Sequence, residues 1–430
     1  MKVRQKLLIS FISILSLGLL IPSIASCDSS EYDPSYYTEG LEFMLSLDGE
    51  CYAVKGYTGT DTTVIIPSIY EGKPVTDIYN DAFYGCGSLK NIDIPHSVTR
   101  IGGGAFIDCK SLKNVIIPDS ISSINDYAFY GCSSLESINI PDSVSAIKQA
   151  SFNGCSSLKS ITLPDSVKTI GLYAFANCTS LTNIVLPDSM TSIDPGTFAN
   201  CKSLTKVIIP DSMTSIAFSA FDGCSSLKYN VCDNGLYLGN ENNPYFALIK
   251  VSSTDITSCE INENTKLICS NAFKNCSSLT SIIIPDSVKN TGTEAFSGCS
   301  SLTSVSIGNG LISIDSHVFD GCSALANISI GNGLTSIESA AFDGCRSLES
   351  ITLPDSVKTI GLYAFADCKS LTNIVIPVSL TNIDSMAFKN CDNLENVYYK
   401  GTEEQWNNIH IHKIGNNYLT KANIIYNYKG

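Results

Sequence analysis

The sequence predicts a mainly β solenoid of about 14 stacked coils with a period of 23 residues. A pair that is Ala-Phe or a close variant lies three residues before a Cys at thirteen places. A fixed period of about 20 to 50 residues is typical of repeat architectures, which grow by stacking. Hydrophobic residues make up 44% of the chain and charged residues only 16%, which favours one continuous core. The repeat cysteines are Cys86, Cys109, Cys132, Cys155, Cys178, Cys201 and Cys224, then Cys276, Cys299, Cys322, Cys345, Cys368 and Cys391.

One coil can be followed from Leu158 to Cys178. Its first three apolar residues have the spacing of a strand, which ends at Pro164 because proline has no N–H for a ladder. Asp165 and Ser166 favour a turn, since their side chains can bond nearby backbone. The positions expected to face the interior are Leu158, Ile161, Leu163, Val167, Ile170, Ala174, Phe175 and Cys178.

Two breaks in the period set the expected domain boundaries. The first coil is lengthened around residues 72–74, and Cys224 and Cys276 are 52 residues apart. We expect a tether and N-terminal cap over 27–60, array 1 over 61–228, a β-hairpin island over 229–255, array 2 over 256–396 and a C-terminal cap over 397–430. The island has apolar runs at 236–238 and 245–251 around a Gly/Asn/Pro cluster, the pattern of a hairpin. We expect it to protrude, either as a spacer or with exposed aromatic residues that contact a partner.

The N-terminus predicts export. Lys2, Arg4 and Lys6 precede an apolar run over 7–21, and small residues follow before Cys27. Ile24 to Cys27 resembles a bacterial lipobox, which implies a lipoprotein-type signal peptide over 1–26 and lipidation of Cys27. We expect a membrane-anchored lipoprotein at the cell surface; a secreted protein with an ordinary signal is the alternative.

The repeated motif A-F-x-x-C-x-S-L-x-x-I-x-I-P-D-S-V resembles the BspA-like, treponemal-type leucine-rich repeat family over about residues 61–396. The resemblance implies a parallel sheet along the concave face of the solenoid. It also implies a surface protein that contacts host matrix proteins or other cells. The pattern G-T-x-x-Q-W at Gly401, Thr402, Gln405 and Trp406 resembles the C-terminal cap common in this family.

The chemistry-bearing residues suggest no catalytic site. Of the 18 cysteines, the thirteen repeat cysteines are interpreted as buried thiols, although disulfides between coils remain open. A Cys259–Cys269 pair also remains open. His410 and His412 flank Ile411 without an evident third metal ligand. One aspartate per turn forms a stripe that either caps turns or associates loosely with cations: Asp119, Asp142, Asp165, Asp188, Asp211, Asp286 and Asp355. We therefore expect no catalytic residue, no metal and no cofactor.

The strand residues that point outward are the candidate binding site. With a net charge of −14 and no basic stripe, the chain is not expected to bind nucleic acid. We expect extracellular protein or glycan ligands on a non-enzymatic, adhesion-type face; the alternatives are a structural spacer or an enzyme that uses the island or cap. Exposed apolar ladders mark interaction surfaces, but β-branched residues also simply suit strands. The candidate residues are Ile116, Asn139, Thr162, Val185, Ile208, Ile283, Ser306, Thr352, Val375 and Tyr398, with Asp93 and Ser329 at the same repeat position.

Overall fold

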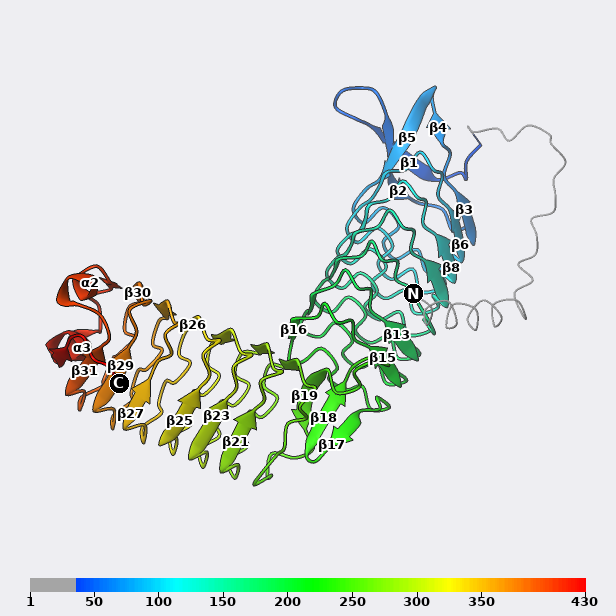
Figure 1. Cartoon of the computed structure of the whole chain (residues 1–430). Coiled ribbons are helices and arrows are strands. Elements are labelled where there is room, and N and C mark those ends of the chain that lie inside the picture. The colour runs from blue at the N-terminus through cyan, green and yellow to red at the C-terminus, as the bar shows by residue number, and fades with distance from the viewer. Residues whose placement is uncertain (1–35) are drawn as a thin grey trace.

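The protein forms a β-solenoid of about 16 turns, seen in a computed structural model that describes residues 36–430. This confirms the fold class; the count exceeds 14 because coils without a repeat Cys, including the cap strand β33 (Asn423–Ile425), add turns. The coils stack into an arc with two arms that meet near the middle of the chain (Figure 1). Residues 1–26 and Cys27, the expected signal peptide and lipidation site, lie outside the described residues.

Most coils have one longer strand, at the residues before the turn. These strands pair in parallel between successive coils, for example Ile116 of one with Asn139 of the next. The longer strands are β3 (Thr63–Ile65), β6 (Asn91–Asp93), β8 (Asn114–Ile116), β10 (Ser137–Asn139), β13 (Asn183–Val185), β15 (Lys206–Ile208), β21 (Ser281–Ile284), β23 (Ser304–Ile307), β25 (Asn327–Ile330), β27 (Ser350–Thr352), β29 (Asn373–Ile376) and β31 (Asn396–Tyr399), followed by β33.

The return leg of each coil contributes a second ladder of two-residue strands. One residue of each strand faces the core, as Ile147 and Ile170 do, and pairs with its equivalent in the next coil. These strands are β7 (Arg100–Ile101), β9 (Ser123–Ile124), β11 (Ala146–Ile147), β12 (Thr169–Ile170), β14 (Ser192–Ile193), β16 (Ser215–Ile216), β20 (Leu267–Ile268), β22 (Asn290–Thr291), β24 (Ser313–Ile314), β26 (Ser336–Ile337), β28 (Thr359–Ile360), β30 (Asn382–Ile383) and β32 (His410–Ile411).

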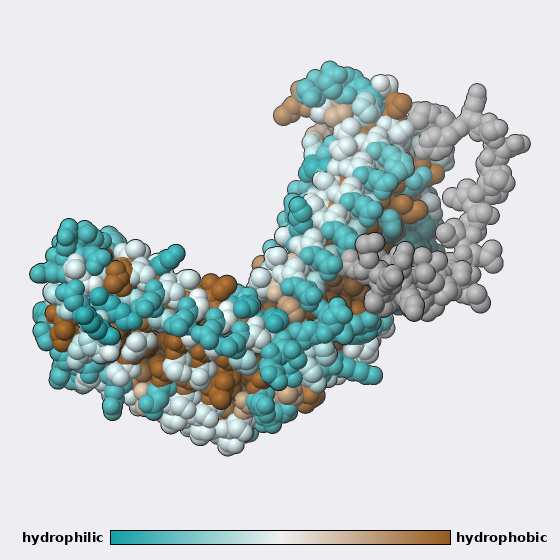
Figure 2. Space-filling view, viewed as in Figure 1, coloured by the Kyte–Doolittle hydropathy of each residue, from teal (hydrophilic) through white to brown (hydrophobic). Residues whose placement is uncertain are grey.

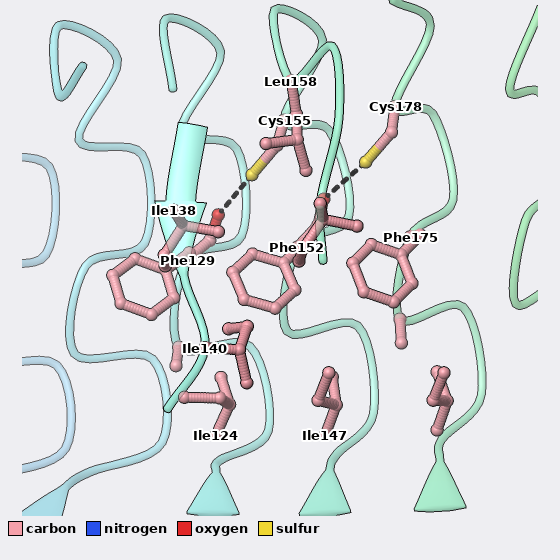
Figure 3. Packing of buried hydrophobic residues seen from close by; sticks show 14 of the residues in the cluster. Ile124, Phe129, Ile138, Ile140, Ile147, Phe152, Cys155, Leu158, Phe175 and Cys178 are labelled. Carbon is pink, nitrogen blue, oxygen red and sulfur yellow. Dashed lines mark hydrogen bonds between the residues drawn. The ribbon is translucent and has the colours of Figure 1, made fainter. Parts of the chain in front are cut away.

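The third side of the coil is a turn that buries the Ala-Phe pair. Phe rings of successive coils stack into a column, with centroids 5.5 Å apart for Phe129 and Phe152 (Figure 3). The backbone N–H of Phe129 donates to the carbonyl of Ser151 in the next coil at 2.8 Å, so this side is hydrogen-bonded as well. The residue before Cys has a left-handed backbone, as in Gly131 (φ 71°) and Asn177 (φ 59°), which explains the Gly, Asn and Asp found there.

The longer strands lie on the outer, convex side of the arc. The expectation that their sheet lies on the concave face is therefore wrong. Figure 1 shows β21, β23, β25 and β27 along the outer edge, and β16, β26 and β30 along the inner edge. A side made of helices would spread the coils, because a helix is about 10 Å across whereas paired strands lie about 4.8 Å apart. Here both sides are strands, so no helical side forces the longer strands inward.

The N-terminal cap consists of two hairpins. One joins β1 (Leu41–Leu45) to β2 (Tyr52–Tyr57), and the lengthened turn of the first coil forms the other, from β4 (Ile69–Tyr70) to β5 (Lys73–Ile78). An aromatic cluster connects them, in which the rings of Phe43 and Tyr70 stack at 3.9 Å. The cap thereby covers the first edge of the solenoid, as edge protection requires.

The island is a three-stranded meander that separates the two arrays. Its strands are β17 (Asn230–Cys232), β18 (Gly235–Leu238) and β19 (Ala247–Val251), and β19 pairs in parallel with β20 of the inner ladder. Neighbouring residues point to opposite sides: Leu238 joins the core cluster of array 1, whereas Tyr237 joins that of array 2. The expected hairpin is present, but β18 and β19 do not protrude, because they contribute buried residues to the cores of both arrays. Strand β17 is largely exposed, so the expected protrusion is limited to this strand.

The C-terminal cap ends the second core cluster. Helix α2 (Glu403–Asn407) starts with a capping box between Thr402 and Gln405, and its Trp406 packs on the ring of Tyr399. A second helix, α3 (Asn417–Lys421), was not expected from the sequence. Hydrophilic residues cover this end of the molecule in Figure 2, whereas a stretch of hydrophobic residues lies along the arm beside it. Within residues 36–430, no helix has the length and apolar character needed to cross a bilayer.

Candidate functional site

The candidate site is the long-strand face, defined as the outward residues of the longer strands and of their equivalents in coils without a strand. Alternate residues along a strand point to opposite sides, so the residue between two core positions faces solvent. At β8, for example, the buried Val115 and Ile117 flank the exposed Ile116. All of the predicted ligand-binding residues occupy this outward position.

Hydrogen-bonded pairing brings some of these residues together and leaves others apart. Within residues 36–430, the longer strands form four separate ladders: β3, β6, β8 and β10; β13 and β15; β21, β23 and β25; and β27, β29, β31 and β33. Adjacent candidates are Ile116 with Asn139, Val185 with Ile208, Ile283 with Ser306, and the run Thr352, Val375 and Tyr398. Thr162 lies in a segment without an assigned strand, and the meander separates the candidates of the two arrays.

Exposure differs strongly along the face. The side chain of Ile116 is 76% exposed and that of Ile283 is 69% exposed, whereas Val185 is 41% exposed. Ile208, Val375 and Tyr398 are half-buried, and the ring of Tyr398 contacts Tyr428 of the cap at 4.7 Å. The apolar part of the face is therefore centred on two isoleucines, one in each array.

A second outward column runs beside these residues and was missed in the sequence. It lies two positions earlier in each strand and consists mainly of Asn and Ser. The amide of Asn396 donates to Asn373 at 3.1 Å, and that of Asn423 donates to Asn396 at 3.1 Å, so a hydrogen-bonded amide ladder follows the coils. The recurrence of Asn or Ser two residues before the exposed position is the signal that would have revealed it.

The charge next to this column differs between the arrays. Array 1 carries five lysines on or beside the long-strand face, with Asp93 and Glu136 as the acidic residues. The corresponding positions of array 2 have Glu349 and Glu395 and no lysine. The lysines of array 1 are Lys90, Lys113, Lys159, Lys206 and Lys228.

The repeat cysteines are part of the interior and not of the site. The thiol of Cys155 donates to the carbonyl of Phe129 in the preceding coil at 3.2 Å, and Cys178 does the same to Phe152 (Figure 3). Eleven coils make this bond; Cys86 and Cys276, the first of each block, have no preceding Phe to accept it. Burial raises the pKa of the Cys178 thiol to about 12, so it stays protonated and unreactive.

The structure supports interior thiols over disulfides. All 17 cysteines of the described region are free. Cys259 and Cys269 belong to different core clusters, so the pair left open by the sequence is not formed. The interpretation of the repeat cysteines as buried thiols is therefore confirmed, apart from the half-buried Cys86, whereas their hydrogen bonds to Phe carbonyls were not predicted.

The turn serines connect coils, which differs from the expected local turn bonds. Ser166 donates to the carbonyl of Val144 in the preceding coil at 2.7 Å, and Ser143 donates to that of Ile121 at 2.6 Å. Ser97 and Ser287, which follow the lengthened coils, have buried hydroxyls without a partner in the described chain. The bond from a turn serine to the preceding coil thus requires that coil to be regular. Each break in the period leaves one turn serine without this bond.

The aspartate stripe and the histidines do not form a metal site. Asp211 accepts from the amide of Asn240 at 2.8 Å, Asp286 accepts from the N–H of Asn309, and Asp355 pairs with Lys400. His410 lies in β32 and is exposed. Among residues 36–430, no group of three or more His, Cys, Asp or Glu side chains is placed to hold a metal ion.

Comparison with known proteins identifies the repeat. The model of the BspA type leucine rich repeat region matches residues 76–171, 151–242, 251–345 and 312–428. A leucine rich cell surface protein from Faecalibacterium prausnitzii is 30% identical over 89% of this chain and 98% of its own, with a TM-score of 0.36.

Two further solved structures are similar in the same way. A leucine-rich repeat protein from Bacteroides ovatus is 28% identical over 92% of this chain and 100% of its own, with a TM-score of 0.39. One from Eubacterium ventriosum is 22% identical over 82% and 93%, with a TM-score of 0.34. No curated protein matches the chain. The family model covers most of the chain, so this protein belongs to the BspA-type leucine-rich repeat family, as its repeat motif predicts.

Proposed function

We propose that the protein acts at the cell surface as a non-enzymatic binding protein that holds a protein or glycan partner against its long-strand face. The observation that carries this proposal is the exposure of Ile116 and Ile283 on a rigid, hydrogen-bonded ladder. Exposed apolar side chains of this size cost solubility, and on a flat face they mark interaction surfaces. The family relationship and the cell-surface relative support the location.

The neighbouring amide and serine column supplies the polar rim of such a surface. Interfaces combine an apolar centre with hydrogen-bonding groups at the edge, and Asn amides can donate and accept. The backbone is already ordered by pairing between coils, so binding costs little conformational entropy. Array 1 adds lysines at the edge, which favours a partner whose contacting surface is acidic.

Binding of the full-length chain to immobilised extracellular-matrix proteins and glycans tests the proposal. The double variant I116T/I283T should bind at least about tenfold more weakly, because each threonine removes apolar contact and retains the β-branched shape. Ile312, which is 52% exposed and directly precedes the inner strand β24, provides the matched control I312T. The proposal fails if nothing binds, or if the control variant loses as much binding as the face variant; an unchanged face variant would favour the spacer function.

The lipid anchor at Cys27 is part of the proposal. Its support is the lipobox-like segment Ile24 to Cys27 after an apolar run. Incorporation of radiolabelled palmitate into the full-length chain should be lost in Cys27→Ala. If Cys27→Ala is labelled as strongly as the native chain, Cys27 is not the lipidation site, and a secreted protein becomes the better hypothesis.

A further inference from the structure

A cleft of 430 Å³ opens where the meander meets the two arrays. It lies between the turn after β15, the turn between β18 and β19, and the starts of the inner strands β20 and β22. Its volume is at the lower end of the range of small-molecule sites, about 300–1,000 Å³. The lining residues are Asp211, Met213, Thr214, Asn242, Asn243, Phe246, Lys266, Lys289 and Asn290.

Two lysines on neighbouring coils give the cleft its positive charge. The backbone N–H of Lys289 donates to the carbonyl of Lys266 at 2.9 Å, so the two residues occupy equivalent positions one coil apart. Neither ammonium forms an ion pair with another side chain of residues 36–430. Two like charges held on adjacent coils repel each other, and an anion that attracts both offsets that repulsion.

The break in the period places amides opposite these lysines. Asn240 holds the meander turn against array 1 by donating to the carbonyl of Ile209 at 3.0 Å and to Asp211 at 2.8 Å. It also accepts the backbone N–H groups of Asn242 and Asn243, which fixes the turn. Within the described chain, no hydrogen bond occupies the side-chain amides of Asn242 and Asn290, so both remain available to a ligand.

In regular coils, the lysine at this repeat position has no meander turn beside it. Lys168 and Lys358 occur in the identical segments 161–175 and 351–365 and have the repeat position of Lys266 and Lys289. No meander turn lies beside them, and they do not line the cleft. The cleft is therefore a product of the junction and not of the repeat.

We infer that this cleft binds a saccharide that carries one carboxylate, such as a uronic acid. The two ammonium groups match the carboxylate, and the amides, Thr214 and the carboxylate of Asp211 match sugar hydroxyls, which both donate and accept. The buried Met213 and Phe246 provide an apolar base. A polyanion is disfavoured by the net charge of −14, and an acidic peptide offers no donors for Asp211 beyond its backbone.

This inference goes beyond the proposed function, because the cleft is at the junction and not on the long-strand face. The two can fail separately, since the variants that test them share no residue. Titration calorimetry of the full-length chain with glucuronate tests the cleft, with glucose, acetate, inorganic phosphate and triglutamate as comparison probes.

Glucuronate should bind at least about tenfold more tightly than glucose or acetate, and K266Q/K289Q should weaken it at least about tenfold. The control K168Q/K358Q should bind as the native chain does, and circular dichroism should show both variants folded. Failure of glucuronate to bind more tightly than acetate would overturn the inference, as would equal losses in the two variants. Tighter binding of triglutamate or phosphate would assign the cleft to a different anion and overturn the saccharide.

Discussion

Array 1 and array 2 bury the same column of Phe rings and the same thiol–carbonyl bonds, but they present different charges on the long-strand face. Centroids of neighbouring rings are 5.3 Å apart for Phe152 and Phe175 and 5.4 Å apart for Phe319 and Phe342. Outside, array 1 has lysines where array 2 has Thr, Ala, Ser, Asn and Glu. Stacking constrains the interior because each residue must match its equivalent one coil away, whereas the face is free to vary. The difference between the arrays therefore lies where a partner would contact them.

The largest expected effect tests whether the two interiors are equivalent. Phe152→Ala and Phe342→Ala should each destabilise the surrounding coils by about 3–5 kcal/mol, because both remove a fully buried ring and leave a cavity. Hydrogen exchange of the coils on each side measures this locally, since repeat proteins unfold in parts. A difference of more than about 2 kcal/mol between the two sites would show that the interiors are not equivalent.

The thiol ladder predicts a smaller and graded effect. Cys155→Ala and Cys345→Ala should cost about 1–2 kcal/mol, since each removes a buried sulfur and its bond to a Phe carbonyl, while that carbonyl still accepts a backbone N–H. Cys86→Ala should cost less, because Cys86 is half-buried and donates to no carbonyl. Chemical unfolding of the three variants checks this order; an equal loss at Cys86 would mean that the thiol bond adds nothing to packing.

A half-buried carboxylate in array 2 predicts a pH-dependent difference. Burial, with a contribution from Glu338, raises the pKa of Asp315 to about 6. The folded state thus binds a proton that the unfolded state releases near pH 4, so stability falls as pH rises from about 4 to about 6 and the penalty persists above that range.

Asp315→Asn removes this penalty. The variant should gain on the order of 1 kcal/mol above pH 6, after allowance for partial exposure, and nothing below pH 4. Asp194 has the same repeat position in array 1, where burial raises its pKa without an acidic neighbour, so Asp194→Asn should gain less. Thermal melts at pH 4 and pH 7.5 measure both; a gain for Asp315→Asn that is the same at both values would contradict burial of the charge as the cause.

The smallest expected effect concerns the face itself. Ile116→Thr and Ile283→Thr should each change stability by no more than about 0.5 kcal/mol, because both side chains are mostly exposed. Unfolding measurements on the two single variants check this. A loss above about 1 kcal/mol at either site would mean that the residue stabilises its ladder, and its binding role would need another variant.

The repeat allowed the sequence to predict the coil and its interior. Phe175 and Cys178 recur at fixed positions in the coils. Each therefore packs against the same residue type in the next coil, which favours side chains that stack in a buried column. The caps were predictable from the loss of the period, which ends before residue 397. The hairpin at 236–251 was predictable from its turn residues.

Features that depend on contacts between coils were not predictable. The curvature of the arc depends on the distance between adjacent coils on each of their three sides. The sequence of one coil therefore does not show which side of the arc holds the longer strands. The bond of Ser166 to Val144 joins residues 22 positions apart, and no local pattern distinguishes it from a turn bond. The burial of Tyr237 and Leu238 in different cores requires knowing that the meander lies between the arrays. The cleft at Lys266 and Lys289 exists only because of that placement.

Hydrogen exchange of the full-length chain, with and without the matrix protein or glycan that binds it most strongly, tests the central claim most directly. We expect protection in peptides that contain β8 and β15 of array 1 and β21 of array 2, and none in those that contain the inner strands β24 and β26. Protection confined to the inner strands or to the caps would contradict the long-strand face as the binding surface.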